Sequence, residues 1–200
     1  MSNTNSANGF QRFGLLDGAS PTMGFQSRLV AQADTTAIGN GDPVVSLGTG
    51  YVTRATAGTT QISGIFRGCW YLNTAVGRVV WSKSWPGASA GGNGHAYIET
   101  DPNALYVAQS NGSAITFADI DANINFAIGT PQTEAAGGFS TSTLNQSTIN
   151  TTDTLPFRIV GLLSQYIPAN SENGTDDASD YNRVIVAPNY TDRKSLVGIV

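Results

Sequence analysis

The sequence predicts an all-β fold, an antiparallel β-barrel or β-sandwich with long loops. Only 12% of the 200 residues are charged; Gly, Thr, Ser, Asn and Ala are abundant, while Glu, Lys, Leu and Arg, which readily populate exposed helix positions, are scarce. Short apolar segments recur about every ten residues, separated by turn-forming Gly, Pro and Asn. A chain of this length buries roughly 70% of its unfolded surface, so stability needs no metal or disulfide.

Residues 1–24 are polar and punctuated by glycine, with Phe10 and Phe13 among a few isolated apolar side chains. This pattern predicts an extended N-terminal arm that becomes ordered by docking on another surface. Residues 25–200 contain no fixed repeat and no clear linker, and we expect them to form a single β domain.

Candidate strands follow the arm in regular order. They lie at residues 25–33, 42–47, 51–55, 61–72, 77–81, 95–99 and 104–109.

Apolar and polar residues alternate between residues 115 and 128. The alternation predicts a half-buried strand whose polar side chains, from Asp119 to Asn125, face solvent, although part of the segment could be helical. A Ser/Thr/Asn-rich tract covers residues 140–154, and the last strands are expected at 155–165 and 183–187.

The charge balance argues against nucleic-acid binding. Net charge is −4, and the nearest approach to a basic cluster is Arg193-Lys194, whereas phosphate contacts need a basic stripe. No apolar run approaches the roughly 18 residues of a membrane span, and the first residues lack the features of a signal peptide. We therefore expect no membrane partner, synthesis in a cytoplasm, and a buried, inert Cys69, the single cysteine.

Catalytic and metal-binding patterns are weak. His95 is the single histidine, so acid–base catalysis is not expected, and His95 with Cys69 cannot complete a zinc site. The segment Asp119–Asn123 imitates the start of a calcium loop, but Ile124 and Thr130 replace the required Gly and Glu. The acidic loop 172–180 leaves cation binding open, and no cofactor is expected.

Three tryptophans lie close together in the sequence. Trp70 is expected to pack in the core, whereas Trp85, which opens a Pro-Gly turn, is expected at the surface and docked on a neighbouring subunit. The candidate protein-interface residues are Phe10, Arg12, Phe13, Trp85 and Arg193.

Several segments, in order along the chain, resemble the structural cement proteins of tailed bacteriophages. The motifs are spread over most of the chain and occur in the same order as in that family. The segments are Asn8-Gly9-Phe10, Ala33-Asp34-Thr35-Thr36-Ala37-Ile38, Gly41-Asp42-Pro43-Val44, residues 62–71, the Trp85-Pro86-Gly87 turn, residues 96–106 and residues 147–162.

The resemblance implies a capsid decoration protein without catalytic residues. It would bind the major capsid protein on the outer surface of the virion, stabilise the mature head, and associate with itself as a homodimer or homotrimer. The loops at 88–94 and 172–180 depart from the family pattern. The alternative is another virion surface component, such as a carbohydrate-binding or receptor-binding β-sandwich; a hydrolase on a β scaffold ranks third.

Overall fold

The protein is described here by a computed structural model that covers residues 2–16, 18 and 24–193. Over these residues the fold is all-β, which confirms the predicted class. Two antiparallel sheets of six strands each are consistent with a β-sandwich, and neither sheet closes into a barrel. Helical structure in this part of the chain is confined to four 3-10 turns, Gly87–Ser89 (η1), Phe117–Asp119 (η2), Glu134–Ala136 (η3) and Leu163–Gln165 (η4).

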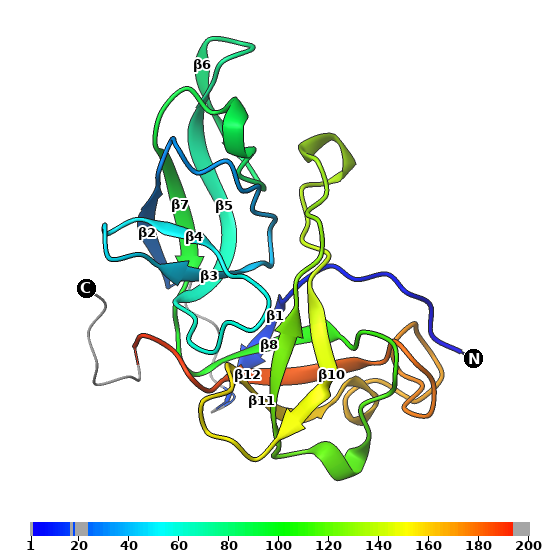
Figure 1. The fold of residues 1–200 in the computed structure, drawn as a ribbon. Helices are drawn as coiled ribbons and strands as arrows, with labels where there is room; N and C mark the ends of the chain where they lie inside the picture. Colours follow the sequence, from blue (N-terminus) through cyan, green and yellow to red (C-terminus); the bar gives the residue numbers. More distant parts are fainter. Residues whose placement is uncertain (1, 17, 19–23, 194–200) are drawn as a thin grey trace.

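The first sheet, called sheet A, forms the lower part of the molecule in Figure 1. Its spatial order is β1-β8-β12-β11-β9-β10. These strands are β1 (Gln11–Leu15), β8 (Ala104–Gln109), β9 (Asn123–Ala127), β10 (Thr143–Asn150), β11 (Phe157–Leu162) and β12 (Arg183–Pro188).

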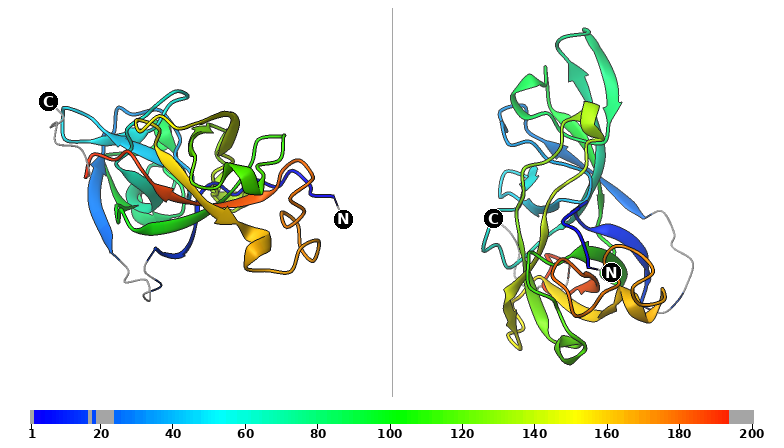
Figure 2. Two further views of the ribbon diagram at one scale, coloured as in Figure 1. Left: turned by 90° about the horizontal axis from the view of Figure 1, so that it is seen from below. Right: turned by 90° about the vertical axis from the view of Figure 1, so that its right-hand side faces the viewer.

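The second sheet, sheet B, forms the upper part, with the order β2-β7-β5-β3-β4. The sixth strand, β6, pairs with the far end of β5 and extends the sheet as a projecting hairpin (Figures 1 and 2). The strands are β2 (Phe25–Val30), β3 (Pro43–Ser46), β4 (Val52–Arg54), β5 (Gly64–Asn73), β6 (Arg78–Ser82) and β7 (Gly94–Glu99).

A bulge in β5 determines which of its side chains face outward. The register between β5 and β7 shifts between Phe66 and Gly68, and Gly68 has a φ of 143°. A Cβ at Gly68 would lie 2.6 Å from the Trp81 ring, so a larger residue does not fit. After the bulge, Cys69 and Tyr71 are buried while Trp70 and Leu72 are exposed.

The largest apolar cluster lies against sheet A, and Phe10 belongs to it. The Phe10 ring stacks on Phe157 with centroids 4.4 Å apart, and it meets the edge of Phe126 at 6.4 Å. The predicted arm therefore docks on its own chain: residues 11–15 become β1, an edge strand paired with β8. Burial of one aromatic anchor and a row of strand hydrogen bonds offset the entropy lost by ordering this segment.

A second cluster belongs to sheet B and surrounds Trp85. The loop between β9 and β10, drawn in olive in Figure 1, rises from sheet A and lies alongside this sheet. Ser140 and Ser142 donate hydrogen bonds of 2.5 and 2.7 Å to the Asp42 carboxylate, which also accepts one from the Gly39 amide. Asp42 is fully buried, and this burial raises the pKa of its carboxyl.

A buried ionic network also joins the two sheets. Glu99 of β7 pairs with Arg12 of β1 and, at 2.7 Å, with Arg67 of β5. Arg67 also donates to the Phe10 carbonyl at 2.9 Å. Burial lowers the pKa of Arg67 to about 10. One carboxylate therefore holds two cations, which makes Glu99 the residue on which the network depends.

Every expected strand overlaps an observed one, but two were missed: β1 within the arm and β10 within the polar tract. The expectation for residues 115–128 is wrong in part, because the strand covers only Asn123–Ala127 and is preceded by the turn η2. Asn123 and Asn125 are buried instead of solvated. The Asn123 amide nitrogen donates to the Thr152 carbonyl, and Asn125 Oδ1 accepts from the Phe126 amide, so each side chain makes a hydrogen bond within the chain. Asn123 Oδ1 itself is buried without a partner.

Candidate protein-binding surface

Two predicted interface residues lie in the core. Phe10 and Trp85 both have 0% exposed surface, so the expectation that Trp85 is presented to a neighbouring subunit is wrong. Trp85 packs edge-on against Tyr71 at 5.9 Å, and its indole Nε1 donates to the Asp34 carbonyl at 3.2 Å. A Cβ at Gly94 would lie 2.4 Å from the Trp85 ring, so this glycine makes the room that the indole occupies.

The other three predicted residues make contacts with different parts of the chain. Arg12 is committed to the buried pair with Glu99. Phe13 is 37% exposed and meets Tyr166 edge-on at 5.0 Å on the sheet A side, while Arg193 donates to the Gln26 side chain. The structure therefore does not bring the predicted residues into one surface.

A contiguous apolar surface exists elsewhere, on the outward face of the β5–β6 hairpin. We call it the β5–β6 patch and define it by Trp70, Leu72, Val79 and Trp81. Trp70 is directly opposite Trp81 and Leu72 is opposite Val79, so the four side chains form two adjacent cross-strand pairs. Their exposed fractions are 43%, 38%, 61% and 44%. The two indoles meet edge-on with centroids 5.5 Å apart, which fixes their orientation.

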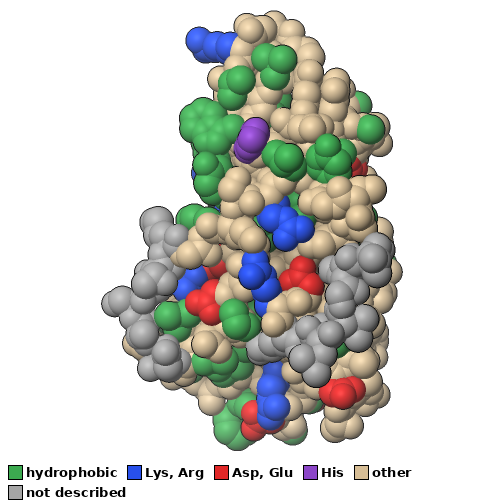
Figure 3. All heavy atoms as spheres, turned by 90° about the vertical axis from the view of Figure 1, so that its left-hand side faces the viewer, with side chains coloured by type: hydrophobic (Ala, Val, Ile, Leu, Met, Phe, Trp, Pro, Cys, Tyr) green, Lys and Arg blue, Asp and Glu red, His purple; other side chains and the backbone are tan. Residues whose placement is uncertain are grey.

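Neighbouring strands extend this surface. Trp81 also meets Tyr97 of β7 edge-on at 5.5 Å. Trp70 is paired across the sheet with His95, and His95 in turn with Leu29, which is also exposed. Figure 3 shows hydrophobic side chains gathered around the histidine on this side of the molecule. Exposed aromatic rings held rigidly on a sheet are typical of protein-binding surfaces.

The β5–β6 hairpin contains no acidic residue. Residues 64–83 include Arg67, Arg78 and Lys83 but no Asp or Glu, although the whole chain is acidic. Arg67 is committed to Glu99, and Lys83 Nζ lies over the Phe139 ring at 5.0 Å. At the same end of β6, the Ser82 hydroxyl donates to the Glu134 carboxylate, so Arg78 at the start of β6 is the exposed basic side chain of the hairpin. The surface therefore combines an apolar centre with a basic side chain at one end.

Sequence reasoning placed Trp70 in the core, and the structure corrects this. The apolar alternation of Trp70 with Leu72 and of Val79 with Trp81 was a usable signal, since strand residues two apart share a face. What the sequence did not reveal was the bulge at Gly68, which decides that this shared face is the outer one.

The side chains considered for catalysis or metal binding lie apart from one another. No group of three or more His, Cys, Asp or Glu side chains is placed to hold a metal among the residues that the structure describes. Asp119 closes the turn η2 by accepting from the Thr116 amide and hydroxyl, and Asp121 pairs with Arg158 at 3.1 Å, so the calcium-like segment does not converge. Cys69 is buried as expected, and its burial raises the thiol pKa to about 12.

The acidic loop 172–180 is organised by the N-terminal segment. The Asn3 amide donates to the carbonyls of Asp176 and Asp180 at 2.8 and 3.1 Å, and its oxygen accepts from the Gly174 amide. The Asp176 carboxylate accepts from the Ser179 hydroxyl, which lowers the pKa of Asp176. These local bonds account for the geometry of the loop.

Comparisons of the chain with protein-family models, with curated proteins and with solved structures found no match. Among the described residues no helix is long and apolar enough to cross a membrane.

Proposed function

We propose that this chain is a phage capsid cement protein that binds the outer surface of the major capsid protein lattice and stabilises the mature head. The resemblance of its ordered motifs to that family supports the proposal. The structural observation that carries it is the β5–β6 patch, a rigid apolar surface that is fully formed before any partner arrives. A preformed surface loses little conformational entropy on binding.

The proposed contact is made by the two indoles and their neighbours. Trp is among the residues that contribute most to protein interfaces, because a large ring is buried at the cost of few rotatable bonds. Trp70 and Trp81 support each other across the strand pair, so both rings keep their binding geometry in the free protein. We therefore assign the centre of the interface to these two side chains.

The charges favour the capsid lattice over a second copy as the occupant of this patch. A symmetric self-contact through the hairpin would offer Arg78 no acidic partner from residues 64–83 of the second copy. An apolar surface with an acidic side chain beside it on the major capsid protein would complement both the apolar centre and Arg78. A homodimer or homotrimer of this chain would use a different surface.

Binding of this kind stabilises a shell without chemistry. A ligand that binds the assembled lattice and not its broken form adds RT ln(1 + [L]/Kd) of stability per site. Oligomers that contact several capsid subunits at once gain effective concentration, so modest contacts become long-lived. The required properties are rigidity, repetition and surface complementarity.

The test mixes the purified chain with bare, expanded capsids and measures bound copies and the melting temperature of the shell. We expect saturable binding and a higher melting temperature. Val79→Glu, which places a carboxylate at the most exposed position of the patch, is expected to abolish both effects, whereas Phe117→Ser, at an exposed aromatic residue of η2, is the matched control. A chain that stays unbound on intact expanded shells contradicts the proposal. Sedimentation of the free chain reports self-association separately.

A further inference from the structure

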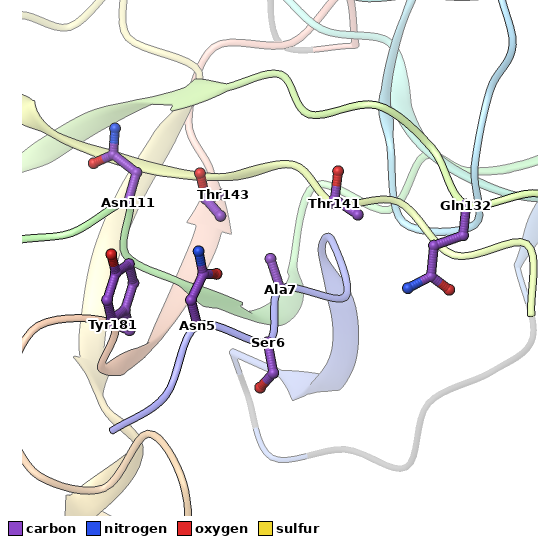
Figure 4. Close-up of a pocket in the computed structure, with 8 residues that line it drawn as sticks. All are labelled: Asn5, Ser6, Ala7, Asn111, Gln132, Thr141, Thr143 and Tyr181. Carbon is purple, nitrogen blue, oxygen red and sulfur yellow. The ribbon is translucent and has the colours of Figure 1, made fainter. Parts of the chain in front are cut away.

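A polar cleft of about 580 Å³ opens on the sheet A side of the molecule (Figure 4). The N-terminal segment around Asn5 and the ring of Tyr181 form one wall, and Asn111, Thr141 and Thr143 form the opposite wall. Gln132 lies at the far end. The volume falls in the range of small-molecule sites, about 300 to 1,000 Å³. None of these residues belongs to the β5–β6 patch.

The chemistry of the lining is neutral and strongly hydrogen-bonding. No charged side chain lines the cleft. Amides supply both donors and acceptors, and the hydroxyls of threonine and tyrosine do the same. In the part of the chain that the structure describes, the side chains of Asn5, Gln132, Thr143 and Tyr181 make no hydrogen bond to protein, so their polar groups are available to a ligand.

The wall made by the N-terminal segment and Tyr181 is held by one buried residue, Gln109, which is 3% exposed. Its amide donates to the carbonyls of Thr4 and Tyr181, each at 3.0 Å, and its oxygen accepts from the Ser6 amide at 3.0 Å. A single side chain therefore sets the spacing between the N-terminal segment and the tyrosine. This is the arrangement expected of a preorganised site.

The backbone of Tyr181 is strained. Its φ is 60°, in the left-handed region. Among the described residues, the other non-glycine residues with a positive φ are Asp121 and Asn170. Asp and Asn tolerate this conformation, whereas a bulky aromatic residue does so at a cost. The Tyr181 amide donates to the Gly112 carbonyl at 2.8 Å, which together with Gln109 keeps the backbone in place. The ring of this residue lines the cleft.

We propose that this cleft binds a neutral carbohydrate. A sugar ring has an apolar C–H face that packs on the Tyr181 ring, and hydroxyls that both donate to and accept from the side chains of Asn5, Thr143 and Gln132. Anionic ligands such as phosphates lack a cation here, and a lipid lacks an apolar wall. The site is independent of the capsid-binding proposal and would give the chain a second binding activity.

The test screens the full chain on an array of neutral glycans and then titrates the best glycan by calorimetry. Tyr181→Ala and Thr143→Val are each expected to weaken binding at least tenfold, and Thr143→Val preserves side-chain shape while removing the hydroxyl. Tyr166→Ala, at an exposed tyrosine outside the cleft, is the matched control and is expected to leave binding unchanged.

Far-ultraviolet circular dichroism confirms that each variant is folded. If no neutral glycan binds, or if binding is insensitive to both cleft variants, the proposal is overturned. Binding of extended peptides without glycan binding, tested on a peptide array, overturns it as well and assigns the cleft to a protein partner. Capsid binding by the same variants stays intact if the two sites are independent.

Discussion

Replacing Trp81 with serine tests the proposed capsid-binding surface most directly. A tryptophan offers roughly 250 Å² of surface. With 44% of it exposed in the free chain, ~110 Å² is left for a partner to cover. At about 25 cal/mol per Å², covering this area contributes at most just under ~3 kcal/mol. After the costs of ordering and desolvation, we expect a loss of about 2 kcal/mol, or roughly 30-fold in Kd.

The assay measures Kd on expanded capsids by sedimentation of bound and free chain. Trp81→Ser also removes ring contacts with Trp70 and Tyr97, so its free energy of unfolding is expected to fall by about 1 kcal/mol. Val79→Glu removes no aromatic contact and separates lost binding from lost stability. If both variants remain folded and bind capsids as tightly as the unaltered chain, the assignment of the patch is refuted.

Three further predictions concern stability, each measured by urea unfolding. Trp85→Ala is expected to lower the free energy of unfolding by about 3–5 kcal/mol, since the ring is fully buried; a change below about 1 kcal/mol would contradict its place in the core. Glu99→Gln removes the buried carboxylate that two partly buried arginines share and is expected to cost about 3–5 kcal/mol, whereas a neutral effect would show that the network contributes nothing. Burial raises the pKa of Asp42 in the folded state above the ordinary 3.8, so the folded state favours the protonated carboxyl. The stability gained from protonating Asp42 is fully present below pH 3.8 and is lost as pH rises through the folded-state pKa. Acidification from neutral pH toward the ordinary pKa is therefore expected to stabilise the unaltered chain relative to Asp42→Asn, and the opposite trend would refute the assignment.

The sequence was most informative where short-range patterns are decisive. Turn-forming residues separate apolar runs throughout residues 25–113, and every strand expected there is present. It was least informative for β10, because the Ser/Thr/Asn tract lacks the apolar alternation that marks a strand. That strand exists because β9 offers a partner edge, and such long-range pairing leaves little trace in local composition.

The candidate site was harder to anticipate than the fold. Trp70 and Trp85 look similar in sequence, yet the first is exposed and the second fully buried. The bulge at Gly68 turns Trp70 outward, and the absence of a side chain at Gly94 admits Trp85 to the core. The orientation of Trp70 and the burial of Trp85 both depend on glycines, and the sequence alone does not show which glycine affects which ring.

By itself, the sequence determined the all-β class, the positions of most strands and the burial of Cys69, because these follow from composition, period-two patterning and turn chemistry. Only the tertiary structure decided that Phe10 packs within its own chain, that Glu99 holds two arginines between the sheets, and that the exposed aromatic surface lies on the β5–β6 hairpin. The physical reason is that an outward or inward position in a strand is set by register and by the surface that covers it, and both arise from residues distant in the chain.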